Sequence, residues 1–234
     1  MSSSYLRSTV MLDPRAAYAR WAPCYDQTPN PLTALEERLM SPVLSEFARC
    51  DIVDMGCGTG RWLRKLQMIA PRSLIGIDAS PEMLHQAKRK CLPSTTLIEA
   101  DCVSTPIADN SADLVLASFL LSYVEHLGRF AAEAARILRS GATLIVSDVH
   151  PGARSYGWRR TFRAGSDLFE VATYPYTVGA LISALEIAGL TIEKLIEASF
   201  GETEQRIFYA NGMADRLRRV ESLPVAYWAQ LRLR

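Results

Sequence analysis

The most informative segment of the sequence is a glycine-rich loop at residues 54–60, which reads Asp54-Met55-Gly56-Cys57-Gly58-Thr59-Gly60. A short apolar run at 52–55 leads into the loop, and residues 62–70 after it place apolar side chains at helical spacing. Glycines between a strand and a helix let a ligand approach the backbone and meet the free N–H groups of the helix N-terminus. The sequence therefore predicts a ligand site beside this loop, at the carboxyl edge of a sheet.

The spacing around the loop separates two classes of nucleotide site. A dinucleotide fingerprint, G-x-G-x-x-G/A, needs Gly or Ala where this chain has Arg61. A short dehydrogenase would also carry a Tyr-x-x-x-Lys pair, and neither Tyr18 nor Tyr123 is followed by Lys four residues later. What remains is an acid two residues before the first glycine and a second acid, Asp78, at the end of the next apolar run. A carboxylate there can accept hydrogen bonds from both hydroxyls of a ribose.

Short apolar runs alternate with stretches of helical spacing along the rest of the chain, which is the pattern of βαβ units. The helices that we expect outside the glycine-loop region include 13–20, 33–48, 127–139 and 177–188. The runs that we expect to be strands are 52–55, 74–77, 95–100, 113–118, 142–149, 190–200 and 205–212, with the last two antiparallel. This predicts an α/β fold with a Rossmann-like, seven-stranded, mostly parallel sheet and helices on both faces.

Composition excludes several classes of function. The 234 residues carry 26 Lys and Arg against 25 Asp and Glu, a net charge of +1, which argues against binding to a nucleic acid backbone or an anionic membrane. Five scattered cysteines and three histidines favour neither a disulfide framework nor a metal site. No apolar window reaches the length of a membrane span or a signal-peptide core. We therefore expect a cytoplasmic protein with a small-molecule partner, no metal, no nucleic acid and no membrane, as a monomer or homodimer.

Four motifs, taken in their order along the chain, make this sequence resemble the class I S-adenosylmethionine-dependent methyltransferases, in particular the small-molecule type-11 group. The motifs are the loop at 54–60, Asp78, the segment Glu99-Ala100-Asp101-Cys102, and the strand at 113–119 together with Leu138-Arg139-Ser140-Gly141. The resemblance runs from about Tyr18 to Asp148. It implies S-adenosyl-L-methionine as methyl donor, S-adenosyl-L-homocysteine as product, and transfer to O, N or C of a small molecule, with an aromatic or natural-product intermediate as a candidate acceptor.

The resemblance also assigns roles to individual residues. Asp54 would hold the methionine ammonium group, Asp78 the ribose and Asp101 the adenine amine, while Tyr18 and Tyr25 would close over the sulfonium as a lid. Simpler interpretations stay open, because Asp54 can cap the loop and tyrosines on a short helix can merely pack. The residues assigned to the cofactor are Tyr18, Tyr25, Asp54, Gly56, Cys57, Gly58, Gly60, Asp78, Ala79, Met83, Asp101, Cys102 and Ser118.

The resemblance implies a division of the chain as well. Residues 1–48, which prolines break into short helices, would form an N-terminal helical cap and lid. Residues 49–234 would form the catalytic domain, with 150–176 as a substrate-shaping insertion in a single structural unit. An acceptor with a proton to lose would need a base, and His150, His126 and Tyr123 are the candidates. His150 is preferred because it follows a core strand, although a His before a Pro can also merely cap a turn.

One local cluster suggests how the acceptor is held. Residues 154–163 read Arg-Ser-Tyr-Gly-Trp-Arg-Arg-Thr-Phe-Arg, with four arginines and three aromatics. Arg154, Trp158 and Arg159 would suit an anionic or carboxylate-bearing aromatic substrate; alternatively, this is a surface hairpin whose Trp158 and Phe162 pack down. The strand at 113–118 is not followed by the N/D-P-P-aromatic motif of nucleobase and glutamine N-methyltransferases, which favours a small molecule. A non-catalytic S-adenosylmethionine-binding regulatory protein is the alternative function.

Overall fold

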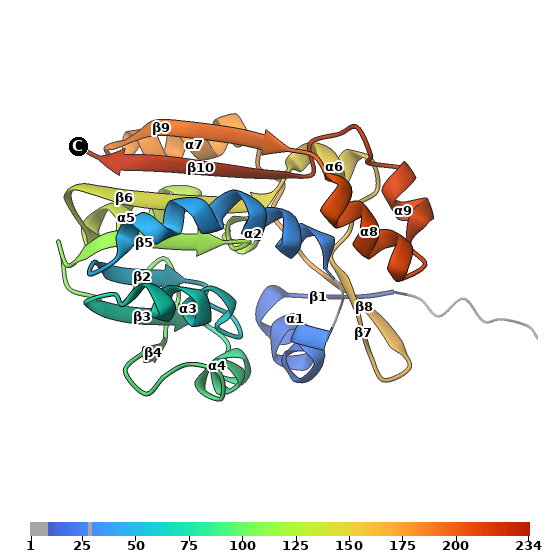
Figure 1. The fold of residues 1–234 in the computed structure, drawn as a ribbon, viewed down its shortest axis with the longest axis horizontal. Coiled ribbons are helices and arrows are strands. Elements are labelled where there is room, and N and C mark those ends of the chain that lie inside the picture. The colour runs from blue at the N-terminus through green and yellow to red at the C-terminus, as the bar shows by residue number, and fades with distance from the viewer. Residues whose placement is uncertain (1–8, 28–29) are drawn as a thin grey trace, which may run out of the picture.

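The computed structural model describes residues 9–27 and 30–234. Its main sheet has seven strands in the order β4-β3-β2-β5-β6-β10-β9. The strands are β2 (Asp51–Met55), β3 (Ser73–Asp78), β4 (Thr96–Glu99), β5 (Ala112–Ser118), β6 (Leu138–Val149), β9 (Leu190–Ala198) and β10 (Ala226–Leu233). The first five are parallel, whereas β10 runs antiparallel between β6 and β9 (Figure 1). The Rossmann-like α/β class is confirmed, and the strand order reverses between β2 and β5.

Helices cover both faces of this sheet. The first face packs against α2 (Pro31–Leu44) and α3 (Arg61–Leu66), which bury Met40, Leu63 and Leu66. The opposite face packs against α5 (Leu127–Ile137) and α7 (Val178–Ile187), which bury Phe130 and Leu185. The helix α4 (Pro81–Lys88) connects β3 to β4. Because both faces are covered, the central strands are buried throughout, as their continuous apolar runs predict.

The seventh strand is not the run at 205–212, and that expectation is wrong. Residues Glu202–Ala210 form the helix α8, followed by α9 (Ala214–Arg218), and the antiparallel strand is β10. Glu204 accepts a hydrogen bond from the N–H of Gly201 (2.7 Å) at the start of α8, and Phe208 is buried one turn later. Arg232 lies on β10 and pairs with Glu193 of β9.

The N-terminal region divides into two parts that pack on different surfaces. The strand β1 (Val10–Leu12) pairs in parallel with β8 (Asp167–Val171), which forms a hairpin with β7 (Thr161–Ala164). The helices α1 (Pro14–Trp21) and η1 (Ala22–Gln27) lie against this small sheet (Figure 1). Of residues 1–48, which we expected to form a cap, α2 packs its apolar face onto the main sheet; residues 1–8 lie outside the described residues.

We call α1, η1 and the β1-β8-β7 sheet the lid layer. Its core is aromatic: Trp21 stacks on Phe162 with ring centroids 4.6 Å apart, and Phe162 stacks on Phe169 at 5.4 Å. Residues 10–27 of the expected cap and β7 and β8 of the expected insertion thus pack into one unit. The helix α6 (Pro151–Ser155) leads from β6 into this unit.

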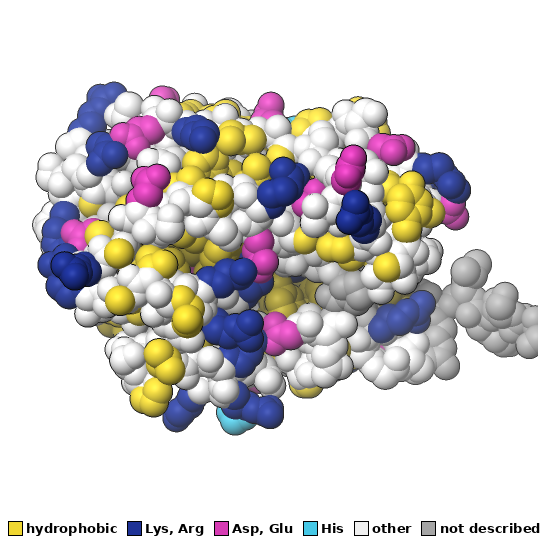
Figure 2. All heavy atoms as spheres, viewed as in Figure 1, with side chains coloured by type: hydrophobic (Ala, Val, Ile, Leu, Met, Phe, Trp, Pro, Cys, Tyr) yellow, Lys and Arg dark blue, Asp and Glu magenta, His cyan; other side chains and the backbone are white. Residues whose placement is uncertain are grey.

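Two further properties of the structure bear on its partners. Positive and negative side chains are interspersed over the face shown in Figure 2, in keeping with a net charge of +1. Within residues 9–27 and 30–234, no helix is long and apolar enough to cross a lipid bilayer.

Candidate functional site

A cleft of about 720 Å³ lies between the carboxyl ends of the central strands and the lid layer. It sits where the strand order reverses, which is where open α/β sheets bind ligands. The residues assigned to the cofactor from sequence that line it are Tyr18, Tyr25, Asp54, Gly56, Cys57, Gly58, Asp78, Ala79, Met83, Asp101, Cys102 and Ser118. The exception is Gly60, which the structure does not bring to the cleft.

The glycine loop explains this exception. Gly58 has a φ of +54°, and a Cβ built there would meet no atom within 4 Å, so the backbone at this position faces open space in the cleft. Gly60 has a φ of +81°, but its Cβ would lie 3.0 Å from Cys91 Sγ and 3.1 Å from Ala87 Cβ. Gly58 therefore leaves room for a ligand, whereas Gly60 allows the loop to pack against the end of α4.

Asp78 supports the loop from the end of β3. Its Oδ2 accepts a hydrogen bond from the N–H of Gly58 (2.8 Å), and its Oδ1 accepts one from the N–H of Ser80 (2.9 Å). The carboxylate is thus fixed in the cleft wall, with lone pairs remaining on both oxygens. This geometry suits the acceptance of hydrogen bonds from a bound polyol.

Asp54 is the most unusual group in the cleft. Its side chain is 1% exposed and its Oδ1 has no hydrogen-bond partner within the described structure. Burial raises the pKa of Asp54 to about 8, although the nearby Arg61 lowers it, and the carboxylates of Glu36 and Asp78 raise it further. Buried carboxylates normally have partners. An unpartnered oxygen in a cleft wall therefore indicates that a ligand supplies the missing donor, and a cationic donor would suit it best.

Residues of α4 and of the segment after β4 line another part of the cleft. Met83 is 1% exposed and lines the cleft from α4, and Asp101 accepts a hydrogen bond from the N–H of Val103 (3.0 Å). Burial raises the pKa of Cys102 to about 12 and also raises the pKa of Cys57. Both thiols therefore stay protonated near neutral pH, which argues against a nucleophilic role.

A buried acid that the sequence analysis missed lies behind the cleft. Glu36 of α2 is 2% exposed and accepts hydrogen bonds from Ser118 Oγ (2.7 Å) and Trp62 Nε1 (3.1 Å), and also from Arg61 and Ser147. The hydroxyl of Ser118 is therefore committed to this network rather than to a ligand. The signal that could have found Glu36 is its position on the apolar face of α2, among Leu32, Leu35 and Met40.

Three tyrosines meet at the cleft, of which Tyr18 and Tyr25 come from the lid layer and Tyr123 comes from the short helix η4 (Leu121–Tyr123). Tyr18 meets Tyr123 edge-on with ring centroids 5.3 Å apart, and the hydroxyl of Tyr25 accepts a hydrogen bond from Arg160 Nη2 (3.0 Å). The layer is also tied to the glycine loop, because Thr59 Oγ1 donates to Asp26 Oδ1 (2.8 Å). The two expected lid tyrosines therefore face the cleft while they pack.

The three candidate bases lie in different places. Tyr123 lines the cleft, and burial raises its pKa to about 12, so the phenol stays protonated at neutral pH. His126 is exposed where α5 begins and lines the cleft mouth. His150 lines neither this cleft nor the neighbouring pocket: its Nδ1 accepts a hydrogen bond from the N–H of Gly152 (3.0 Å), and its Nε2 lies 2.8 Å from Glu197 Oε1. The structure thus brings two of the three candidates to the cleft.

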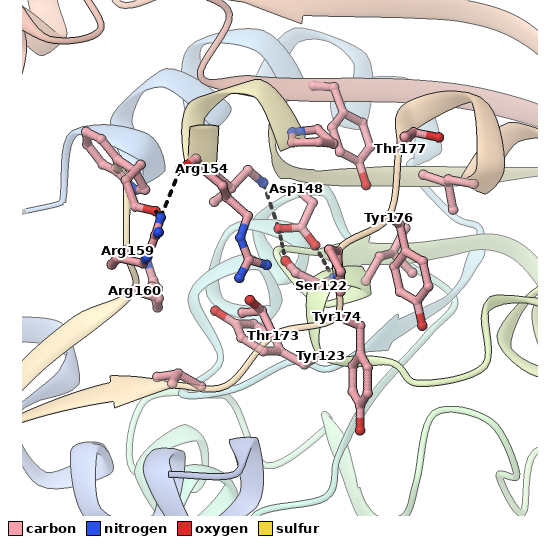
Figure 3. A pocket seen from close by; sticks show the side chains of 18 of the residues that line it. Ser122, Tyr123, Asp148, Arg154, Arg159, Arg160, Thr173, Tyr174, Tyr176 and Thr177 are labelled. Carbon is pink, nitrogen blue, oxygen red and sulfur yellow. Dashed lines mark hydrogen bonds between the residues drawn. The ribbon is translucent and has the colours of Figure 1, made fainter. Parts of the chain in front are cut away.

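A second cavity of about 270 Å³, which we call the side pocket, adjoins the cleft and shares Tyr123 and Tyr174 with it (Figure 3). The three expected substrate residues line it. Arg159 Nη1 donates to the backbone carbonyls of Arg154 (2.9 Å) and Trp158 (3.0 Å), and Trp158 packs against Phe200 with ring centroids 5.9 Å apart. Trp158 thus packs down, as the surface-hairpin alternative expected, and still contributes a wall of the pocket.

Comparison with known proteins shows which families and structures this chain is similar to. Residues 53–146 match the type-11 family model described as a methyltransferase domain. An uncharacterized methyltransferase of Emericella nidulans is 29% identical over 76% of each chain. Demethylmenaquinone methyltransferase of Tropheryma whipplei is 32% identical over 58% of this chain and 59% of its own length. An S-adenosylmethionine-dependent methyltransferase from Mesorhizobium loti superposes with a TM-score of 0.65 at 23% identity, covering 82% of this chain and 97% of that one.

The fold is that of the class I methyltransferases. Residues 53–146 match the type-11 methyltransferase domain, and relatives named methyltransferases align over a larger part of the chain. The alignment covers 76% of the length of the Emericella nidulans relative and 59% of the length of the Tropheryma whipplei relative.

Proposed function

We propose that the protein transfers the methyl group of S-adenosyl-L-methionine to O, N or C of a small molecule and releases S-adenosyl-L-homocysteine. The observation that carries this proposal is the unpartnered, buried Oδ1 of Asp54 in a cleft of about 720 Å³ at the carboxyl edge of the sheet. We further propose that the protein works in the cytoplasm as a monomer or homodimer, without nucleic acid, membrane or metal.

The residues around the cleft fit this cofactor. Asp54 would accept from its ammonium group, Asp78 from its ribose hydroxyls and Asp101 from its adenine amine, while Met83 would pack on the base. When bound, the cofactor supplies an electrophilic methyl group. The protein's own task is then to orient the acceptor and exclude water, and the lid tyrosines Tyr18 and Tyr25 are placed for that exclusion.

Proton removal from the acceptor would fall to a group at the cleft. Tyr123 is protonated at neutral pH because its pKa is raised to about 12, so it can donate a hydrogen bond to the acceptor but is a poor base. His126 is the imidazole at the cleft mouth, and we propose it as the base for an acceptor that needs one. His150 does not enter this proposal because both of its ring nitrogens are engaged outside the cleft.

The test is turnover with a small-molecule extract as the acceptor pool. Methyl-labelled S-adenosylmethionine is incubated with the protein and the extract, and both S-adenosylhomocysteine and labelled product are quantified. We expect product formation that Asp78→Ala strongly reduces. Tight cofactor binding without labelled product from any pool would instead support the alternative, a non-catalytic S-adenosylmethionine-binding regulatory protein.

A further inference from the structure

The side pocket contains an unusual concentration of unsatisfied polar atoms. Arg154 Nη1, Arg160 Nε and Thr173 Oγ1 are buried and have no hydrogen-bond partner within the described residues, and all three residues line this one cavity. Figure 3 shows the Arg154 side chain reaching into the pocket toward Thr173. Because buried donors are nearly always satisfied, three of them around one space indicate an absent acceptor group.

The charges around the pocket favour an anion. Arg159 lies beside Glu170, with Nε 3.6 Å from Oε1, so these two charges largely cancel. Asp148 also lines the pocket, but its oxygens accept hydrogen bonds from Ser122 N (2.6 Å), Ser122 Oγ (2.7 Å) and Val149 N (2.6 Å) rather than from an arginine. Burial raises the pKa of Asp148, although the hydrogen bonds from Ser122 and Val149 and the charge of Arg160 lower it. Arg154 and Arg160 therefore face at most one carboxylate charge, that of Asp148.

The remaining walls are apolar and largely aromatic. Trp158, Tyr174 and Tyr176 line the pocket together with Val171 and Leu181. Its volume of about 270 Å³ lies just below the range of drug-sized sites, so it suits a single ring. The fork of an Arg guanidinium matches the two oxygens of a carboxylate.

We propose that the side pocket binds the carboxylate of an aromatic acid, which is the methyl acceptor. The inference rests on the proposed function and adds Arg160 and Thr173 to the residues expected from sequence. The carboxylate would lie among Arg154, Arg160 and Thr173, and the ring would extend past Tyr123 and Tyr174, the two residues that the pocket shares with the cleft. The acceptor atom is then on the end of the molecule opposite the carboxylate.

The experiment is calorimetric titration of the protein, with and without saturating S-adenosylhomocysteine. The probes are benzoate, 4-hydroxybenzoate and phenylacetate, each beside its matched carboxamide, and phenyl phosphate. We expect at least one carboxylate to bind about tenfold or more tightly than its carboxamide, a difference of about 1.4 kcal/mol. Arg154→Gln should abolish this preference, and Arg154→Lys, which keeps the charge without the fork, should retain only part of it.

The controls separate the pocket from the fold and from the cofactor site. Arg163→Gln changes an exposed arginine of β7 that lines neither cavity and should leave the preference intact. Thr173→Val, which preserves shape, should reduce the preference without changing S-adenosylhomocysteine affinity. Equal binding of every carboxylate and its carboxamide would overturn the inference, as would tighter binding of phenyl phosphate than of benzoate. Failure of S-adenosylhomocysteine to bind would instead contradict the proposed function. The titrations without S-adenosylhomocysteine would still show whether the side pocket prefers a carboxylate to a carboxamide.

Discussion

At the scale of single residues, Asp54 links the pH to both stability and ligand binding. Its pKa is raised by burial to about 8, against about 4 in an unfolded chain. The folded protein thus keeps a proton that the unfolded chain loses between about pH 4 and pH 8, so the contribution of Asp54 to stability falls as the pH rises through that window. A cationic ligand group beside Oδ1 would lower the pKa of Asp54, because it favours the ionised form.

The first prediction is that binding of S-adenosylmethionine releases a proton from Asp54. Below pH 8 the affinity should rise with pH, by up to about tenfold per unit, because binding requires the ionised carboxylate. Calorimetry in buffers of different ionisation enthalpy at pH 7 measures the released proton. Asp54→Asn should weaken binding, remove the release and make the free protein more stable at pH 8. Equal proton release by wild type and Asp54→Asn would contradict this role.

The second prediction contrasts two glycines of the loop. Gly58→Ala would place a methyl group in the open cleft, so it should fold with a modest loss of stability, about 1 kcal/mol, and lose cofactor affinity. Gly60→Ala would push its Cβ against Ala87 and Cys91, so it should cost more stability, about 1–3 kcal/mol. Thermal unfolding and S-adenosylhomocysteine titration of both variants distinguish the effects. The reverse ranking would mean that Gly58 does not face the ligand.

At the scale of elements, the Glu36 network joins α2 to α3, β5 and β6. Glu36 offsets the half-buried charge of Arg61 and satisfies Trp62, Ser118 and Ser147. Because the network lies directly behind the cleft, it holds the helix that follows the glycine loop against the ends of the strands. The element arrangement around the site thus depends on one acid that the sequence analysis did not single out.

The third prediction follows from this network. Glu36→Ala leaves Arg61 without its buried partner and should destabilise the protein by about 3–5 kcal/mol. The matched control is Glu37→Ala, which removes more exposed contacts to Arg61 and Lys65 and should cost at most about 1 kcal/mol. Chemical denaturation of the two variants measures both values. Similar costs for the two variants would show that the buried network adds nothing beyond surface pairing.

The secondary structure could be predicted where local patterns were strong. The glycine loop and the apolar runs that became β2, β3 and β5 carry their own strand and turn signals. The run at 205–212 was wrongly predicted to be a strand. Its buried residue Phe208 lies on the helix α8 and packs against α2, and the sequence alone does not show that packing partner. The side-chain direction of His150 depends likewise on where Glu197 of β9 lies, and β9 is 40 residues further along the chain.

At the scale of the whole molecule, the lid layer joins segments about 150 residues apart. The pairing of β1 with β8 and the stack of Trp21 on Phe162 make the N-terminal helices and the insertion a single unit over the cleft. No local pattern predicts such a pairing, which explains why the contact between the N-terminal segment and the insertion was not predicted from the sequence. The insertion also supplies the three arginines of the side pocket, Arg154, Arg159 and Arg160.

The fourth prediction tests the lid layer as a unit. Trp21 is 3% exposed and lies beneath Arg160, whose guanidinium carbon is 5.0 Å from its ring centroid. Trp21→Ala should destabilise the protein by about 3–5 kcal/mol and weaken S-adenosylhomocysteine binding, because Tyr18 and Tyr25 lose their support. Tyr209→Ala, at a 60% exposed aromatic, is the control and should change neither. Unaltered S-adenosylhomocysteine affinity in Trp21→Ala would show that the lid does not contribute to the site.

Calorimetric titration of the purified protein with S-adenosylmethionine and S-adenosylhomocysteine, with NADH as the comparison, tests whether the cleft is the cofactor site. We expect the first two to bind with dissociation constants of about micromolar size, equivalent to about −8 kcal/mol, and NADH not to bind. Absence of binding by either sulfur compound, or equal binding of NADH, would contradict the assignment of the cleft.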